Sequence, residues 1–276
     1  MRMLIPNRPG PLACALALLW VGLQVVQAQG DNAPSLDYLQ AQVAAHPERI
    51  DLVLALGNAA AAAGKLDVAI AGFQKVLDTV EPDSPEAGDL DLRIGEAYRR
   101  KGDREAAIAW LSRASELLPD QPVVRGTLAL VLDASGEKEA AEREYRATLE
   151  LDPENAVAMN NLAFLLAERG RDLDEALGLA QSAVALMPGD AEILDTTGWV
   201  RLKRNETGAA IDLFASAWLK SPGNDEYRRH LLLALERKTD RNPVMDELKS
   251  LLAGEVSPSA TNRALELLKA VANPSR

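Results

Sequence analysis

Four prolines return along this chain at an almost constant spacing. They are Pro119, Pro153, Pro188 and Pro222, and the intervals between them are 34, 35 and 34 residues. A period of this length corresponds to one pair of helices, which cannot bury its apolar face without neighbouring pairs. Such pairs stack into a solenoid with a long concave surface. The sequence therefore predicts an all-α fold built from antiparallel helix pairs.

The segments between the prolines share a pattern of small and large residues. Small residues such as Gly95 and Ala107 are expected where two helices approach closely, and large residues such as Tyr145 are expected to fill the space between them. The pattern predicts five repeats within residues 50–224. They span residues 50–87, 88–121, 122–155, 156–190 and 191–224.

A turn residue separates the two helices of each repeat. In four repeats this residue is a glycine, for which a left-handed backbone is least costly. In the fifth repeat Asn205 occupies the same place, and the fourth repeat has one extra residue within 171–174. The four glycines are Gly64, Gly102, Gly136 and Gly170.

On these residues the chain resembles the tetratricopeptide repeat (TPR) family. The resemblance covers about residues 50–224, with a weaker sixth repeat from 225 to about 253. It implies a right-handed superhelical solenoid, and it implies a protein-binding adaptor or assembly factor. The sequence departs from the family pattern at Arg201, where a large apolar residue is usual, and at Thr148, where a small residue is usual.

The first 28 residues are expected to be a cleaved signal peptide. Arg2 and Arg8 precede an apolar run from Leu12 to Val26, and Ala28 lies before the expected cut. A membrane-spanning helix needs about 20 apolar residues, and this run has 15. Cleavage would leave no stable membrane span and would place the protein in the periplasm or outside the cell. The alternative is an uncleaved membrane anchor.

The remaining segments are predicted to close the two ends of the stack. Residues 29–49 are expected to hold a linker and an N-terminal capping helix. Residues 225–276 are expected to hold the degenerate sixth repeat and a C-terminal capping helix. Cys14, the only cysteine, lies in the predicted signal peptide, so the mature chain would have no disulfide and no thiolate chemistry.

Composition and motifs argue against several classes of function. The chain has 30 basic and 41 acidic residues, a net charge of −11, and nucleic acids demand basic surfaces. Its two histidines, His46 and His230, have no second histidine or cysteine at metal-ligand spacing. We recognise no phosphate-binding loop and no set of catalytic residues. The sequence therefore predicts no enzymatic activity, no cofactor and no metal.

The concave face is expected to carry the binding site. Phe164 and Trp199 occupy the same slot in adjacent repeats, so they should lie side by side as an apolar patch. Next to them, Asn160, Asn161 and Thr196 could hydrogen-bond the backbone of an extended peptide. The alternative is that both aromatic rings only pack against a neighbouring helix.

Other inward-facing slots widen the set of candidates. Asp195 belongs to the same patch, and Arg93 and Arg100 form a second cluster with Arg99 in the second repeat. The sixth repeat places Arg229, His230 and Leu233 on this face. The slot that carries a lysine in the family's carboxylate clamp has no lysine here, so binding of a chain's C-terminal carboxylate through such a clamp is not expected. Its occupants are Leu54, Leu92, Gly126, Asn160 and Asp195.

The sequence thus predicts a non-catalytic, exported TPR scaffold that binds a protein or peptide. The stretches 160–168 and 195–200 resemble bacterial exported repeat proteins. An alternative is therefore an accessory subunit of envelope polysaccharide export or outer-membrane biogenesis, with carbohydrate held on Trp199 and Phe164. A further alternative is an enzyme with a site between repeats. Neither the partner nor the oligomeric state follows from the sequence.

Overall fold

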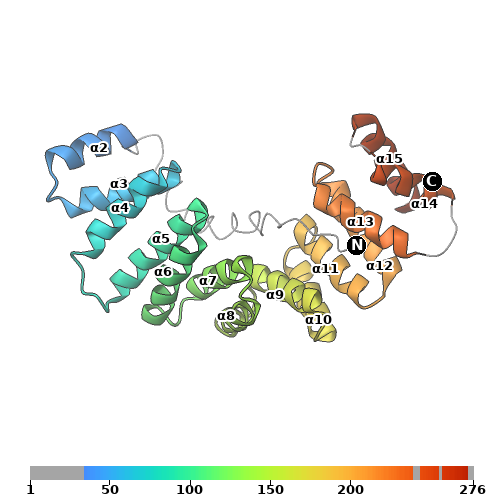
Figure 1. Cartoon of the computed structure of the whole chain (residues 1–276), viewed down its shortest axis with the longest axis horizontal. Coiled ribbons are helices and arrows are strands. Elements are labelled where there is room, and N and C mark those ends of the chain that lie inside the picture. Colours follow the sequence, from blue (N-terminus) through green and yellow to red (C-terminus); the bar gives the residue numbers. More distant parts are fainter. Residues whose placement is uncertain (1–33, 239–242, 255–256, 273–276) are drawn as a thin grey trace. The chain divides into compact units, whose positions relative to one another are not determined.

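The computed structural model describes residues 34–238, 243–254 and 257–272, and over these ranges the chain is helical with no strands (Figure 1). The signal peptide predicted for residues 1–28 lies outside the described residues. Among the residues that the structure does describe, no helix is both long enough and apolar enough to cross a membrane.

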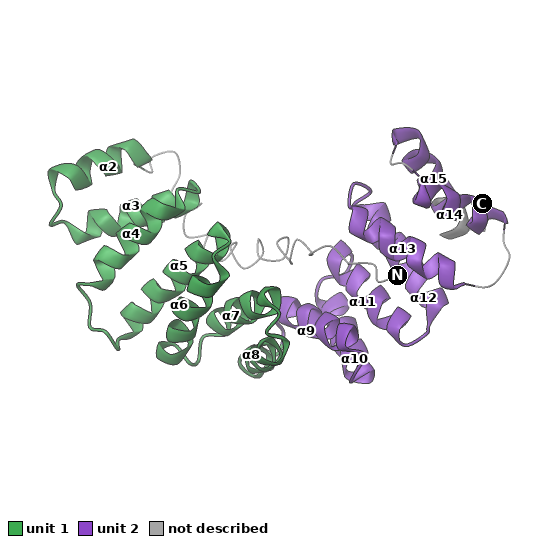
Figure 2. Ribbon diagram, viewed as in Figure 1, with its two compact units in different colours: residues 1–153 green, residues 154–276 purple. Residues whose placement is uncertain are grey.

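The helices form two compact units that divide directly after Pro153 (Figure 2). The first unit contains α2 (Leu36–Ala45), α3 (Ile50–Ala62), α4 (Leu66–Leu77), α5 (Pro85–Lys101), α6 (Arg104–Leu117), α7 (Pro122–Ser135) and α8 (Lys138–Leu151). The second contains α9 (Ala156–Arg169), α10 (Leu173–Leu186), α11 (Ala191–Lys203), α12 (Thr207–Lys220), α13 (Asp225–Arg237), α14 (Pro243–Ala253) and α15 (Pro258–Ala272).

Within each unit, consecutive helices pack as pairs. In the first unit α3 packs on α4, α5 on α6 and α7 on α8, and α2 covers α3. In the second unit α9 packs on α10 and α11 on α12, and α13 to α15 continue the stack. This pairing is the one that the 34-residue period predicts, because each pair buries its apolar faces against its neighbours.

The turns between paired helices depend on residues with a left-handed backbone. Gly64, Gly102, Gly136 and Gly170 have φ between 65 and 85°, as their place in the repeat predicts. Asn205 takes the same conformation at φ 65°, and asparagine is one of the few other residues that adopt it readily. The extra residue of the fourth repeat appears as a second left-handed position, Asp172, at φ 50°.

Small residues of the first helix make room for large residues of the second. A Cβ atom added at Gly95 would lie 2.7 Å from Cγ of Leu111. One added at Gly198 would lie 2.8 Å from the ring of Phe214. Both large side chains are fully buried, so the predicted close approach at these small-residue positions is confirmed.

Thr148, the first departure from the family pattern, lies in the core. Its side chain is 1% exposed, and its hydroxyl donates to the backbone carbonyl of Glu144 at 2.8 Å. Gly126 faces it from α7, where an added Cβ would come into ordinary contact with Thr148 at 3.6 Å. The larger threonine is therefore accommodated by a residue without a side chain opposite it.

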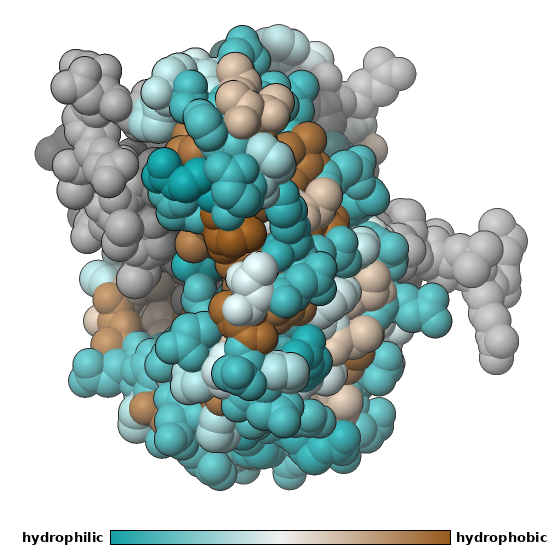
Figure 3. All heavy atoms as spheres, turned by 90° about the vertical axis from the view of Figure 1, so that its left-hand side faces the viewer, coloured by the Kyte–Doolittle hydropathy of each residue, from teal (hydrophilic) through white to brown (hydrophobic). Residues whose placement is uncertain are grey.

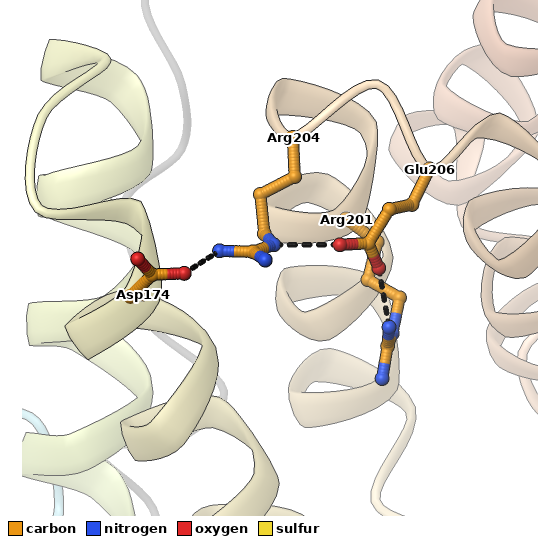
Figure 4. A network of polar contacts seen from close by, with 4 residues as sticks. All are labelled: Asp174, Arg201, Arg204 and Glu206. Carbon is orange, nitrogen blue, oxygen red and sulfur yellow. Dashed lines mark hydrogen bonds and ion pairs between the residues drawn. The ribbon is translucent and has the colours of Figure 1, made fainter.

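Arg201, the second departure, belongs to an ion-pair network at the turn between α11 and α12 (Figure 4). Its guanidinium pairs with Glu206, which also accepts from Nε of Arg204 at 2.7 Å. Arg204 reaches on to Asp174 at the start of α10. Hydrogen bonds from Arg204 and Arg201 hold the pKa of Glu206 below its usual range. Charged contacts thus replace the apolar contact that is usual at this slot.

Exposed apolar side chains are scattered in the described residues. Figure 3 looks onto the end of the first unit that carries α2, and hydrophilic residues cover most of the visible face. The large apolar residues with the greatest exposure are single residues on different helices, which need no functional explanation. They are Tyr38, Val123, Leu151 and Leu186.

Candidate partner-binding site

Three first helices of the second unit carry the candidate site, and each begins with a capping side chain. Asn155 accepts from the amide of Ala158 at 3.0 Å at the start of α9. Asp190 and Asn224 cap α11 and α13 in the same way. The caps satisfy backbone amides that have no partner inside the helix. Because they recur one period apart, the three helices start in equivalent registers.

An aromatic row runs across these three helices. Phe164 on α9 and Trp199 on α11 have ring centroids 6.5 Å apart at an interplanar angle of 25°. Trp199 and His230 on α13 are closer, at 4.7 Å and 29°. The prediction that Phe164 and Trp199 lie side by side is confirmed. The structure adds His230, which the sequence placed among the inward-facing residues without assigning it to the patch.

A buried carboxylate fixes the orientation of His230. Its Nδ1 lies 2.8 and 3.0 Å from the two carboxylate oxygens of Asp195, and Asp195 is 4% exposed. A carboxylate only accepts hydrogen bonds, so Nδ1 of His230 is the donor. The imidazole also packs at 5.4 Å against Phe214, which is fully buried on α12. Asp195 therefore orients the imidazole of His230 within the aromatic row.

Acidic groups surround the start of α13. Burial raises the pKa of the Tyr227 phenol, and the carboxylates of Glu192 and Asp195 raise it further, followed by Asp190 and Glu226. Each of these carboxylates opposes formation of a second negative charge nearby. The phenol therefore stays protonated at physiological pH.

Trp199 has polar partners as well as aromatic ones. Its indole N–H donates to Oε1 of Glu168 at 2.7 Å. The ammonium of Lys203 lies 4.8 Å from the centroid of the Trp199 ring and 3.4 Å from the same carboxylate oxygen. The edge of the aromatic row is thus bordered by one exposed ion pair, which we call the Glu168–Lys203 pair.

The polar side chains next to the aromatic row are more deeply placed than the sequence suggests. The sequence places Asn160, Asn161, Thr196 and Asp195 on the concave face, and in the structure their exposed fractions are only 1, 6, 5 and 4%. Phe164 lies one turn beyond the two asparagines on α9, where a long side chain leans back over the preceding turn. These polar side chains are therefore buried in the unbound chain, and their binding role stays a prediction.

Two buried amide atoms lack partners. Oδ1 of Asn160 and Nδ2 of Asn161 have no hydrogen-bond partner, although neither atom is accessible to water. A buried polar atom without a partner costs about 1–3 kcal/mol. The site therefore contains one acceptor and one donor that a ligand could satisfy.

The arginine cluster belongs to the first unit and is described separately from the aromatic row. Arg93 is exposed and bonds to Asp89 at 2.8 Å and to Asn58 at 3.0 Å. Arg100 donates to the backbone carbonyl of Ala61 at 2.7 Å. These contacts orient both guanidiniums along the first helices of adjacent repeats, and their role in partner binding stays a prediction.

The site offers the chemistry of recognition. It combines stacked aromatic rings, two buried amides and an ion pair, and peptide-binding sites use these kinds of group. Within residues 34–238, 243–254 and 257–272, no cluster of three or more histidine, cysteine, aspartate or glutamate side chains could hold a metal ion.

Helix pairs that repeat and stack along the chain define a helical repeat protein. The sequence profile of the tetratricopeptide repeat matches residues 24–84, 54–122 and 127–191, which together make up more than half of the chain. The chain belongs to the tetratricopeptide repeat family. Members of this family typically act as non-catalytic scaffolds.

Relatives with related sequences are bacterial. The TPR repeat-containing protein PA4667 of Pseudomonas aeruginosa is 27% identical over 192 residues, 70% of this chain and 30% of that protein. The type IV pilus assembly protein PilF of the same species is 30% identical over 155 residues, 55% of this chain and 61% of PilF. Cellulose synthase operon protein C of Xanthomonas axonopodis is 39% identical over 127 residues, 46% of this chain and 8% of that protein. The chain spans less than two thirds of the length of each.

Solved structures support the fold. YrrB, described as a TPR protein with an unusual peptide-binding site, superposes with a TM-score of 0.58 at 18% identity, covering 73% of this chain and all of YrrB. MamA from Desulfovibrio magneticus gives a TM-score of 0.52 at 20% identity, covering 66% of this chain and 96% of MamA. The predicted all-α, TPR-like fold is confirmed.

Proposed function

We propose that this chain is a non-catalytic scaffold that binds an extended segment of a protein partner along the first helices of its second unit. The observation that carries this proposal is the aromatic row of Phe164, Trp199 and His230, which spans three successive repeats. Phe164 and Trp199 are only partly buried. Partly exposed aromatic side chains in a polar setting are the usual anchors of a protein interface.

The buried side-chain amides of Asn160 and Asn161 could pair with the backbone of the bound segment. Oδ1 of Asn160 needs a donor and Nδ2 of Asn161 needs an acceptor, and one peptide group supplies both. A partner reaches these atoms only if a covering side chain moves. Phe164 lies on the same face of α9, so a change of its rotamer on binding would open the way. The satisfied hydrogen bonds would offset the cost of that movement.

Relatives support a binding role in the assembly of other proteins. PilF is named as a type IV pilus assembly protein, and YrrB is described by its peptide-binding site. By analogy, we infer that the partner of this chain is a component of an assembly rather than a small metabolite.

Site-specific photo-cross-linking tests the binding site. We expect a photoreactive phenylalanine analogue at position 164 to give a discrete adduct in envelope extracts, because this side chain lies where the partner binds. The same analogue at Tyr38, which is 55% exposed on α2, is the matched control and should give none. Equal adducts from both positions, or none from position 164, would contradict the proposed site.

We also propose that the protein is exported. Arg2, Arg8 and the apolar run from Leu12 to Val26 support a signal peptide that is cut after Ala28. N-terminal sequencing of the protein from its native host should therefore begin near Gln29. Recovery of a chain that starts at Met1 from the cytosol would contradict export, and a Met1 chain in the membrane would favour the uncleaved anchor.

The relatives favour a role in the cell envelope as a second candidate. Cellulose synthase operon protein C and PilF are named for a cellulose synthase operon and for type IV pilus assembly, which supports the predicted accessory role in polysaccharide export or outer-membrane biogenesis. Direct carbohydrate binding is less favoured, because sugars stack on open aromatic faces. The ring of Trp199 already contacts His230 and Lys203.

A further inference from the structure

We propose that Glu168 and the ring of Trp199 form a recognition site for a cationic side chain, and that a lysine or arginine of the bound segment replaces Lys203 there. This inference rests on the proposed function and names the chemistry of the partner. In the structure, the chain's own ammonium group occupies the site.

The geometry is that of a cation site. Lys203 Nζ lies 4.8 Å from the centroid of the Trp199 ring, within the range of a cation–π contact. The same ammonium lies 3.4 Å from Oε1 of Glu168. That carboxylate also accepts from the indole N–H of Trp199 at 2.7 Å, so ring and carboxylate are held in one arrangement. The pair would accept any ammonium or guanidinium of suitable reach.

Lys203 is held weakly enough to be displaced. The side chains of Lys203 and Glu168 are 29 and 41% exposed, and exposed ion pairs contribute little stability. A lysine side chain also regains rotamer freedom when it leaves for solvent. Glu168, by contrast, is kept in position by the Trp199 indole, so the acceptor remains when Lys203 departs.

The net charge of the chain favours a cationic partner over an anionic one. The whole chain is acidic, with a net charge of −11. Such a field attracts a basic segment and repels an acidic one. Apolar residues next to the lysine or arginine would contact the remaining surface of Phe164.

Selection from a displayed library of random short peptides, with the chain from Gln29 to Arg276 as bait, tests this inference. The tightest peptide that Trp199→Ala weakens is then synthesised in two forms, with its lysine or with norleucine in its place. We expect norleucine to weaken binding roughly fivefold or more, the size of a partly desolvated cation–π contact. This loss should shrink in Glu168→Gln, and Lys203→Met should bind the lysine peptide more tightly.

Matched controls separate this site from general electrostatics. Lys249→Met and Glu247→Gln make the same changes of charge on α14, where Lys249 pairs with Asp246 and Glu247 pairs with Arg263. Both should leave peptide binding unchanged. If peptides need Trp199 but contain no lysine or arginine, or if norleucine binds equally well, the cation site is wrong and the proposed function stands. If no selected peptide needs Trp199, the proposed function itself fails.

Discussion

Replacing Tyr145 with alanine is expected to lower the free energy of unfolding by about 3–5 kcal/mol, the usual cost of deleting a buried aromatic side chain. Tyr145 lies on α8 and is 1% exposed, as its slot in the third repeat predicts. The loss combines the transfer of the ring to water with the cavity that remains. Denaturant titration followed by circular dichroism measures it.

The control for this prediction is Tyr38→Ala on α2. Tyr38 is 55% exposed, so its removal should change the free energy of unfolding by less than about 0.5 kcal/mol. Because repeats contact only their neighbours, different parts of the chain should unfold at different denaturant concentrations. Tyr145→Ala should most strongly lower the midpoint of the transition in which α7 and α8 unfold. A loss below about 1 kcal/mol for Tyr145→Ala would mean that this ring does not support the core.

The sequence correctly predicted the features that depend only on residues within one repeat. Proline and glycine positions fix where helices end and turn, and Gly102 and Gly136 show the expected left-handed φ. Asn205 takes the place of glycine because its backbone tolerates the same conformation. Small residues opposite large ones, as at Gly198 and Phe214, follow from the close packing of two helices. Such signals need no knowledge of distant parts of the chain.

The depth of side chains in the candidate site did not follow from the sequence. The position of Asn160 in its repeat predicts which face of the helix it lies on. It does not predict how exposed the side chain is, because exposure depends on the rotamers of neighbours such as Phe164. The sequence placed His230 on the same face but did not assign it to the patch, because only the structure shows its contacts with Asp195 and Trp199. One signal was available. Asp195 and His230 stand 35 residues apart, as do Asn58 and Arg93, so complementary polar residues one period apart predict contacts between adjacent repeats.

Truncating Trp199 to alanine is expected to weaken partner binding by about 2 kcal/mol or more, as the loss of a central aromatic anchor does. From the sequence alone the substitution would leave stability unchanged. The structure indicates otherwise, because Trp199 stacks on His230 and packs against the core of the second unit. We therefore expect an additional loss of about 1–2 kcal/mol in the free energy of unfolding, from the apolar area exposed, with the unit still folded.

Trp110→Ala separates these two effects. Trp110 is a partly buried tryptophan on α6 that packs against the core of the first unit, so its loss should lower stability without weakening binding.

Asn161→Ala should weaken binding by about 0.5–1.5 kcal/mol, as one lost hydrogen bond does. Titration with the partner that cross-linking identifies measures the affinity, and thermal melts measure the stability. If Trp199→Ala unfolds the second unit, the ring is a core residue. If affinity and stability are both unchanged, the partner binds elsewhere, and the cluster of Arg93 and Arg100 becomes the next site to test.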